Sequence, residues 1–222
     1  MTELRKIEEV EIGPEALRGM LVLPPSARGL VIFAHGGGSG RFSPRNNHVG
    51  EGLRAHRLGT LLLDLLMPEE EIDRRLAFDV ELLAHRLLTA TFWVQRESSI
   101  PQLPVCYLGA STGAAAALLA AAQPGASVSA IFSRGGRPDL AADALPHVRA
   151  PTLFLFGSLD RVVLELNRQA YERMTCAREL SVIPGAGHLF DEAGTLDELV
   201  AHAARWFMQA CEQRSPTMAA AQ

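Results

Sequence analysis

Short apolar runs alternate with longer amphipathic stretches along most of the chain. Four runs are almost uninterrupted: LVIFAHG, TLLLDLL, VCYLGA and PTLFLFG. Such runs are typical of parallel strands covered on both faces, because neither face of the strand meets water. The pattern predicts strands at about 4–12, 17–23, 29–35, 59–65, 104–110, 128–133, 151–157 and 178–184. The first two alternate more regularly and precede any helix, so we expect them to form an antiparallel hairpin at the sheet edge.

Helical periodicity fills the intervals between these strands. We expect helices at about 46–57, 72–97, 112–123, 138–147, 164–174 and 195–213. The acidic run Glu69, Glu70 and Glu71 fits the first turn of the long second helix, where the helix dipole favours negative charge. Strands interleaved with helices predict right-handed βαβ units and an α/β fold with a doubly wound, mostly parallel, eight-stranded sheet.

The spacing of the elements leaves no room for a second domain. Between the strands at 128–133 and 151–157 there are only 17 residues, enough for one helix but not for a lid domain. We expect residues 1–213 to form a single α/β domain. The remainder, residues 214–222, has no periodicity and is expected to be a disordered tail.

Composition and charge narrow the classes of function. The chain has 222 residues and a formal net charge of −4, which argues against nucleic acid or an anionic membrane as a partner. Its three cysteines show no CxxC spacing, which fits a reducing cytoplasm. The N-terminus has no apolar signal-peptide core, and no stretch approaches the ~20 apolar residues of a membrane helix.

The stretch LGASTGAAAAL carries the first chemical motif. It matches G-x-S-x-G around Ser111, with Gly109 and Gly113 where neighbouring backbones would crowd a side chain. This arrangement exposes a serine hydroxyl between a strand and a helix N-terminus, although a simple packing turn would also use the glycines. Because parallel sheets bind ligands at the carboxyl ends of their strands, Ser111 is the candidate nucleophile.

A serine nucleophile needs a base, and His188 is the histidine best placed for that role. Of seven histidines, His188 alone follows the last strand in a glycine-rich loop, PGAGHLF. The base in turn needs a carboxylate, for which Asp160 in FGSLDRVV is the candidate. Asp160 could instead cap the following helix, and Asp139 and Asp143 are the fallback acids.

The run HGGGSG at residues 35–40 follows an earlier strand and supplies the fourth element. Acyl transfer develops a negative oxygen, which needs N–H donors that already point at it. We assign these donors to the backbone N–H groups of Gly37 and Thr112, with Gly38 a near equal to Gly37. His35 is expected to brace the loop. The glycine loop could cradle phosphate instead, but it lacks the GxGxxG and Walker patterns.

Four arginines follow strands that end at the same edge. Arg41 and Arg45 lie after the glycine run, and Arg134 and Arg137 follow the strand at 128–133. They could bind a carboxylate or phosphate of a substrate, with Gly38, Arg41 and Arg134 as the candidate substrate contacts. The alternative is that they face solvent or brace their loops. Phe190 and Met67 could form an apolar wall of the site or belong to the core.

These motifs together resemble the α/β-hydrolase fold and, more narrowly, its dienelactone hydrolase-like branch, over roughly residues 17–210. The segments that carry the resemblance are HGGGSGRFSPRN, DLLMPEEE, LGASTGAAAAL, SRGGRPDL, APTLFLFGSLDRVV and IPGAGHLFDEAG. The chain also looks like small hydrolases that are sometimes fused to a phosphoribosyltransferase domain, which we do not expect here. Dienelactone hydrolases proper use a cysteine nucleophile where this chain has Ser111.

The resemblance implies a Ser–His–Asp hydrolase made of Ser111, His188 and Asp160. We expect it to cleave small carboxylic esters through an acyl-enzyme, without a metal or organic cofactor. A thioesterase or acyltransferase with the same triad is the alternative, and a ligand-binding protein on the same fold is the non-enzymatic one. The expected partner is a small-molecule ester, and a homodimer is compatible with the sequence.

Overall fold

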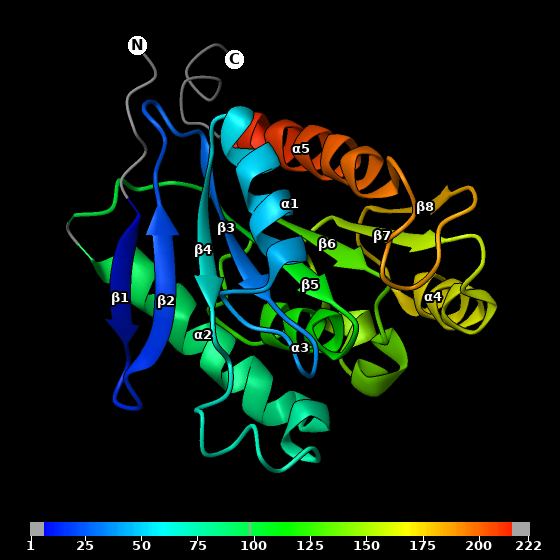
Figure 1. The fold of residues 1–222 in the computed structure, drawn as a ribbon, viewed down its shortest axis with the longest axis horizontal. Coiled ribbons are helices and arrows are strands. Elements are labelled where there is room, and N and C mark those ends of the chain that lie inside the picture. Colours follow the sequence, from blue (N-terminus) through cyan, green and yellow to red (C-terminus); the bar gives the residue numbers. More distant parts are fainter. Residues whose placement is uncertain (1–6, 98, 215–222) are drawn as a thin grey trace.

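One eight-stranded sheet organises the chain in a computed structural model, which describes residues 7–97 and 99–214 (Figure 1). The strands are β1 (Glu8–Ile12), β2 (Leu17–Val22), β3 (Gly29–Ala34), β4 (Leu58–Leu63), β5 (Val105–Ala110), β6 (Ala130–Arg134), β7 (Thr152–Gly157) and β8 (Arg178–Ile183). Their order across the sheet is β1-β2-β4-β3-β5-β6-β7-β8. Strand β2 is antiparallel to β1 and β4, and all other neighbours are parallel. The predicted sheet and its edge hairpin are confirmed.

Helices cover both faces of this sheet. They are α1 (Pro44–Ala55), α2 (Val80–Arg96), α3 (Thr112–Ala121), α4 (Arg161–Arg173) and α5 (Thr195–Arg214). Helices α1 and α5 lie together on one face, and α2, α3 and α4 lie on the other (Figure 1). Alternate residues of β3 enter different cores: Leu30 and Ile32 face α2 and α3, whereas Val31 and Phe33 face α1 and α5. Burial of both faces explains why the central strands are apolar at almost every position.

The long second helix begins later than the sequence pattern predicts. Helix α2 starts at Val80, where the carboxylate of Asp79 accepts the N–H of Leu82 at 3.0 Å, and a short 3-10 helix, η1 (Leu76–Phe78), precedes it. The prediction that the acidic run forms its first turn is therefore wrong. Instead Glu70 accepts the N–H of Met67 at 2.8 Å and pairs with the buried Arg86. This ion pair attaches the segment between β4 and α2 to α2 itself.

The predicted helix at 138–147 is also wrong. Two 3-10 turns occupy this segment, η2 (Pro138–Ala141) and η3 (Leu145–His147). The second contains Pro146, which has no N–H to donate and would clash with the preceding turn of an α-helix. Nothing else is inserted between β6 and β7 in the described chain, so no lid covers the sheet there. The proposed tail lies almost entirely outside the described residues.

No helix of the described residues combines the length and the apolar character that a membrane crossing requires.

The corner between β5 and α3 is packed against the end of β3. A Cβ added at Gly113 would clash with the carbonyl of Ala34 and with the carbonyl oxygen of His35, and all of these are backbone atoms that cannot rotate away. The first turn of α3 can therefore approach β3 only because residue 113 has no side chain.

We predict that Gly113→Ala lowers the free energy of unfolding by about 2–3 kcal/mol, because the backbone must shift to admit the methyl group. Urea unfolding measures this loss. Gly50→Ala is the matched control, since the atoms nearest to its added Cβ belong to the side chains of Arg54 and Leu62. A control within about 1 kcal/mol of wild type is expected, and equal stability of the two variants would contradict the packing argument.

Candidate active site

Ser111 occupies a strained position at the end of β5. Its φ is +52°, a value that non-glycine residues adopt only rarely. Three backbone hydrogen bonds hold it there: its N–H donates to Arg134 O at 3.2 Å, and its carbonyl accepts from the N–H groups of Ala114 and Arg137, both at 3.1 Å. Contacts with β6 and α3 thus fix the serine in a conformation that the isolated chain would avoid.

His188 and Asp160 are brought together from the ends of two other strands. Nδ1 of His188 lies 2.6 Å from Oδ2 of Asp160. Asp160 stands at the N-cap position of α4, but its side chain makes no capping hydrogen bond there. The carboxylate therefore serves the histidine. The fallback acids lie elsewhere: Asp139 pairs with Arg137, and Asp143 is fully exposed beside Arg173.

Ser111 and His188 line the same cavity, which has a volume of about 950 Å³. A Cβ at Gly135 would lie 3.4 Å from Nδ1 and Cε1 of His188, so the ring packs over Gly135, next to the residue that receives the N–H of Ser111. No hydrogen bond between the Ser111 hydroxyl and the His188 ring occurs in the described part of the chain. Hydrogen bonds between catalytic groups are often long before substrate binds, so the absence of this bond does not remove either residue as a candidate.

The glycine loop after β3 passes directly beside Ser111. A Cβ at Gly36 would lie 3.0 Å from Ser111 Cβ, so the loop can approach this closely only with glycine. Gly38 has a φ of +70°, which glycine adopts without strain. The N–H of Thr112, the first residue of α3, is one of those that a helix leaves without an intrahelical partner. Two predicted donor positions, in the loop and at α3, thus flank the serine.

His35 fixes this loop from below. The ring is 4% exposed, and its Nε2 accepts the N–H of Leu65 at 2.9 Å, so the proton of the neutral ring is on Nδ1, which faces the carbonyl of Gly36. Burial lowers the pKa of His35 below its ordinary value of 6.5, against the opposing influence of Asp64 and Glu71. The expected bracing role fits these contacts.

A second, smaller cavity of about 430 Å³ lies on the other side of the glycine loop. Ser111 and the glycines border it, as they border the large cavity, but most of its remaining lining is apolar and includes Leu66, Ala77, Phe78 and Leu83, with Glu71 and Arg74 as the charged members. Ser111 therefore stands between one cavity with several charged groups and one with a more apolar lining.

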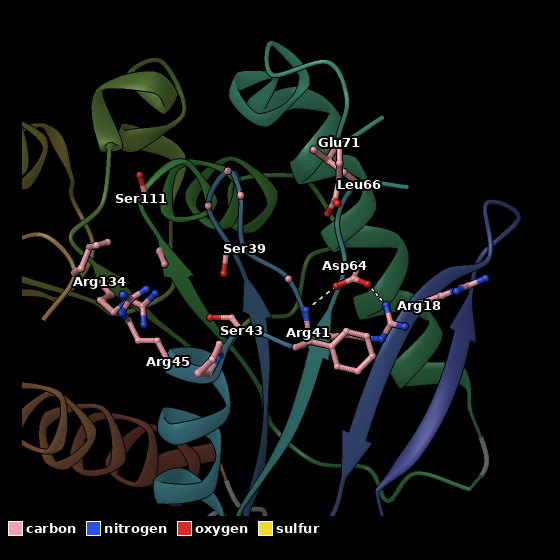
Figure 2. Close-up of a pocket in the computed structure, with 18 of the residues that line it drawn as sticks. Arg18, Ser39, Arg41, Ser43, Arg45, Asp64, Leu66, Glu71, Ser111 and Arg134 are labelled. Atoms are coloured by element: carbon pink, nitrogen blue, oxygen red, sulfur yellow. Dashed lines mark hydrogen bonds and ion pairs between the residues drawn. The ribbon is translucent and has the colours of Figure 1, made fainter. Parts of the chain in front are cut away.

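The four candidate arginines have different environments. Arg41 forms a two-point contact with Asp64, through its backbone N–H at 2.6 Å and its guanidinium (Figure 2). Arg45 binds Asp191 at 2.9 Å and Arg137 binds Asp139 at 2.8 Å. Arg134 is 8% exposed and forms no ion pair in the described chain. Arg41 and Arg137 thus brace their loops, whereas Arg134 is buried and neither faces solvent nor has a carboxylate partner.

The two apolar candidates also differ from each other. Phe190 is 1% exposed and belongs to the core beneath α5, so it forms no wall of the cavity. Met67 lines the large cavity.

Sequence reasoning missed Gly135 and Asp191 as parts of this region, and it missed the pairing of Asp64 with Arg41. The glycine pair of SRGGRPDL was a signal for Gly135, but nothing local indicates which arginine each aspartate meets.

In residues 7–97 and 99–214, no three His, Cys, Asp or Glu side chains converge as metal ligands would.

Comparison with known proteins gives relatives of two kinds. No family model matches the chain. Two proteins of Mycobacterium tuberculosis, which carry the provisional name phosphoribosyl transferase, are 51% identical to it over 203 residues, 90% of this chain and 46% of theirs. The chain thus spans about half the length of these curated relatives.

Solved structures match the chain over nearly its whole length. The dienelactone hydrolase from Anabaena variabilis is similar with a TM-score of 0.88 and 49% identity, covering 92% of this chain and 97% of that one. Est1E from Butyrivibrio proteoclasticus has a TM-score of 0.75 at 15% identity, covering 93% and 99%, which shows a common fold alone. The α/β-hydrolase fold expected from the motifs is confirmed.

The buried His35 makes stability depend on pH. Its pKa is lower in the folded than in the unfolded protein, so between these two values the unfolded state binds more protons and stability falls as pH falls. We predict that wild type loses stability more steeply than His35→Gln from about pH 7 to about pH 5, by at most about 1.4 kcal/mol per pH unit.

Urea midpoints at a series of pH values measure this difference. The glutamine oxygen can still accept the N–H of Leu65, so the variant keeps the loop contact without the titrating ring. Equal slopes for the two proteins would show that His35 is not held neutral by burial.

Proposed function

The chain belongs to the dienelactone hydrolase-like family of α/β-hydrolases, and from that premise we propose that it cleaves small carboxylic esters with Ser111 as nucleophile. The observation that carries the proposal is the strained Ser111 at the strand–helix corner, which shares one cavity with His188, the partner of Asp160. Hydrogen bonds to β6, to α3 and to the loop after β6 hold the residue in this conformation, and Ser111 lines two cavities.

In the proposed reaction His188 accepts the proton of the Ser111 hydroxyl as its oxygen attacks the ester carbonyl. Asp160, bonded to Nδ1, keeps the other ring nitrogen free to accept that proton and stabilises the imidazolium that forms. His188 then protonates the departing alcohol. Water, activated by the same ring, attacks the acyl-enzyme and restores Ser111.

The negative oxygen of each tetrahedral intermediate is assigned to the N–H groups of Thr112 and of Gly37, with Gly38 as the neighbouring alternative in the loop. Thr112 adds the positive end of the α3 dipole. His35 and the Arg41–Asp64 contact hold the glycine loop in place. The loop can therefore present its N–H donors without rearranging. This is the step at which pre-aimed donors contribute most to the rate.

The name carried by the Mycobacterium tuberculosis proteins is not transferred to this chain. This chain matches only 46% of the length of those proteins, and the activity in their name is given for the full-length proteins. A thioester instead of an ester as substrate, and ligand binding without turnover, are the alternatives that the kinetic tests below separate.

We predict that Ser111→Ala and His188→Ala each lower kcat for a para-nitrophenyl ester by about a million-fold, to the level set by binding and the oxyanion donors alone. Asp160→Asn should cost about 100- to 10,000-fold, because the ring loses its fixed tautomer. Asp139→Asn is the matched control and should retain wild-type kcat. Full activity of Ser111→Ala would remove the proposed nucleophile.

Matched ester and thioester substrates with the same acyl group test the bond that is cleaved. We expect a higher kcat/KM for the ester. A clear preference for the thioester would favour the alternative enzyme, and turnover of both at the background rate would favour a binding protein.

A further inference from the structure

Arg134, the last residue of β6, is a buried cation that forms no ion pair in the described chain. Its side chain lines the large cavity and is 8% exposed. One guanidinium nitrogen, Nη2, donates to Oδ1 of Asn46 at 3.3 Å, while Nη1 is buried without a hydrogen-bond partner. Buried charges are almost always paired, because desolvation without a partner is costly. Burial, and then the nearby charge of Arg45, lowers its pKa to about 10, so it remains protonated at neutral pH.

Arg45 adds positive potential beside Arg134, and the weaker influence of Asp191 offsets it only in part. The guanidinium groups of Arg45 and Arg134 lie side by side at one end of the cavity (Figure 2). Arg45 is in the first turn of α1, so the positive end of that helix dipole lies at the same place. The carboxylate that meets Arg45 is Asp191, whose side chain is 63% exposed and leaves Arg134 unpaired.

The other end of the cavity is different. There two arginines, Arg18 and Arg41, and two carboxylates, Asp64 and Glu71, line the cavity, and the Arg41–Asp64 pair holds the glycine loop (Figure 2). Charges of the two signs are equal in number at that end, so the excess of positive charge lies at the Arg134 end. This end is also close to the nucleophile, since the carbonyl of Arg134 accepts the N–H of Ser111.

We propose that this end of the cavity, formed by Arg134, Arg45 and the first turn of α1, binds the phosphate group of a phosphorylated ester substrate. The proposal rests on the proposed function for the ester bond and adds the substrate class. The phosphate lies against the part of Arg134 that lines the cavity and against the guanidinium of Arg45, while the ester carbonyl reaches Ser111. The apolar cavity beyond the glycine loop receives the other side of the ester.

A phosphate fits this end better than a carboxylate for two reasons. Two adjacent guanidinium groups, of which only Arg45 has an ion-pair partner, favour a group that brings close to two negative charges. The donors also outnumber the two oxygens of a carboxylate. Besides the two guanidinium groups they include the hydroxyls of Ser39 and Ser43, each of which lines the cavity and accepts a hydrogen bond from Asn46, so its proton is free to donate.

Binding of inorganic phosphate, measured by isothermal titration calorimetry, tests the subsite without any turnover. We expect saturable binding to wild type that weakens by about tenfold or more in Arg134→Gln and in Arg45→Gln, through loss of a charge-assisted contact. Arg149→Gln is the matched control, since this exposed arginine precedes β7 at the opposite edge of the sheet. Thermal melts show whether each variant folds. If Arg134→Gln does not fold, phosphate binding to Arg45→Gln provides the test.

Absence of saturable phosphate binding to wild type, or binding that neither substitution weakens, would overturn the subsite. Acetate is the carboxylate probe, and acetate that binds as tightly as phosphate would overturn the assignment to phosphate.

Two matched acetate esters then connect the subsite to the reaction: para-acetoxyphenyl phosphate and the neutral para-methylphenyl acetate. We expect kcat/KM to favour the phosphorylated ester by about tenfold or more in wild type, and this ratio to fall towards one in Arg45→Gln. An equal ratio in both proteins would contradict the proposal. If neither ester is cleaved while phosphate binding behaves as expected, the proposed function fails and the anion subsite stands.

Discussion

The backbone conformation of Ser111 is the constraint on which the rest of the site depends. A φ of +52° is unfavourable for serine, and it persists because β6 accepts its N–H and the loop after β6 donates to its carbonyl. The glycines around it are consequences of the same corner: residue 113 must clear the end of β3, and residue 36 must clear Ser111 itself. The glycines thus allow unusually close backbone packing at this one corner, where Ser111 lies between two cavities.

Much of this arrangement could be predicted because short stretches of the sequence indicate it directly. Unbroken apolar runs marked the strands buried on both faces, and the order of the glycine-flanked Ser111, Asp160 and His188 placed three polar groups at one sheet edge. The structure brings Asp160 and His188 into contact and places His188 in the lining of the cavity that Ser111 also lines. It leaves the serine and histidine unbonded, so their partnership remains a proposal about the reacting enzyme.

The failures have tertiary or steric causes. The acidic run at 69–71 looked like a helix start, but Glu70 is held by Arg86, sixteen residues further along the chain. Pro146 broke a predicted helix whose apolar spacing was otherwise suitable. The four arginines were indistinguishable in sequence, because only folding decides that Arg41 meets Asp64 while Arg134 is buried without a carboxylate.

The central claim is that Ser111 is the reacting nucleophile, and labelling with a fluorophosphonate followed by peptide mass mapping tests it most directly. A serine activated by a neighbouring base should take up one phosphonyl group on the peptide that contains Ser111. The label should be absent from Ser111→Ala and strongly reduced in His188→Ala. Stoichiometric labelling of another residue in wild type, or undiminished labelling of Ser111→Ala, would contradict the account.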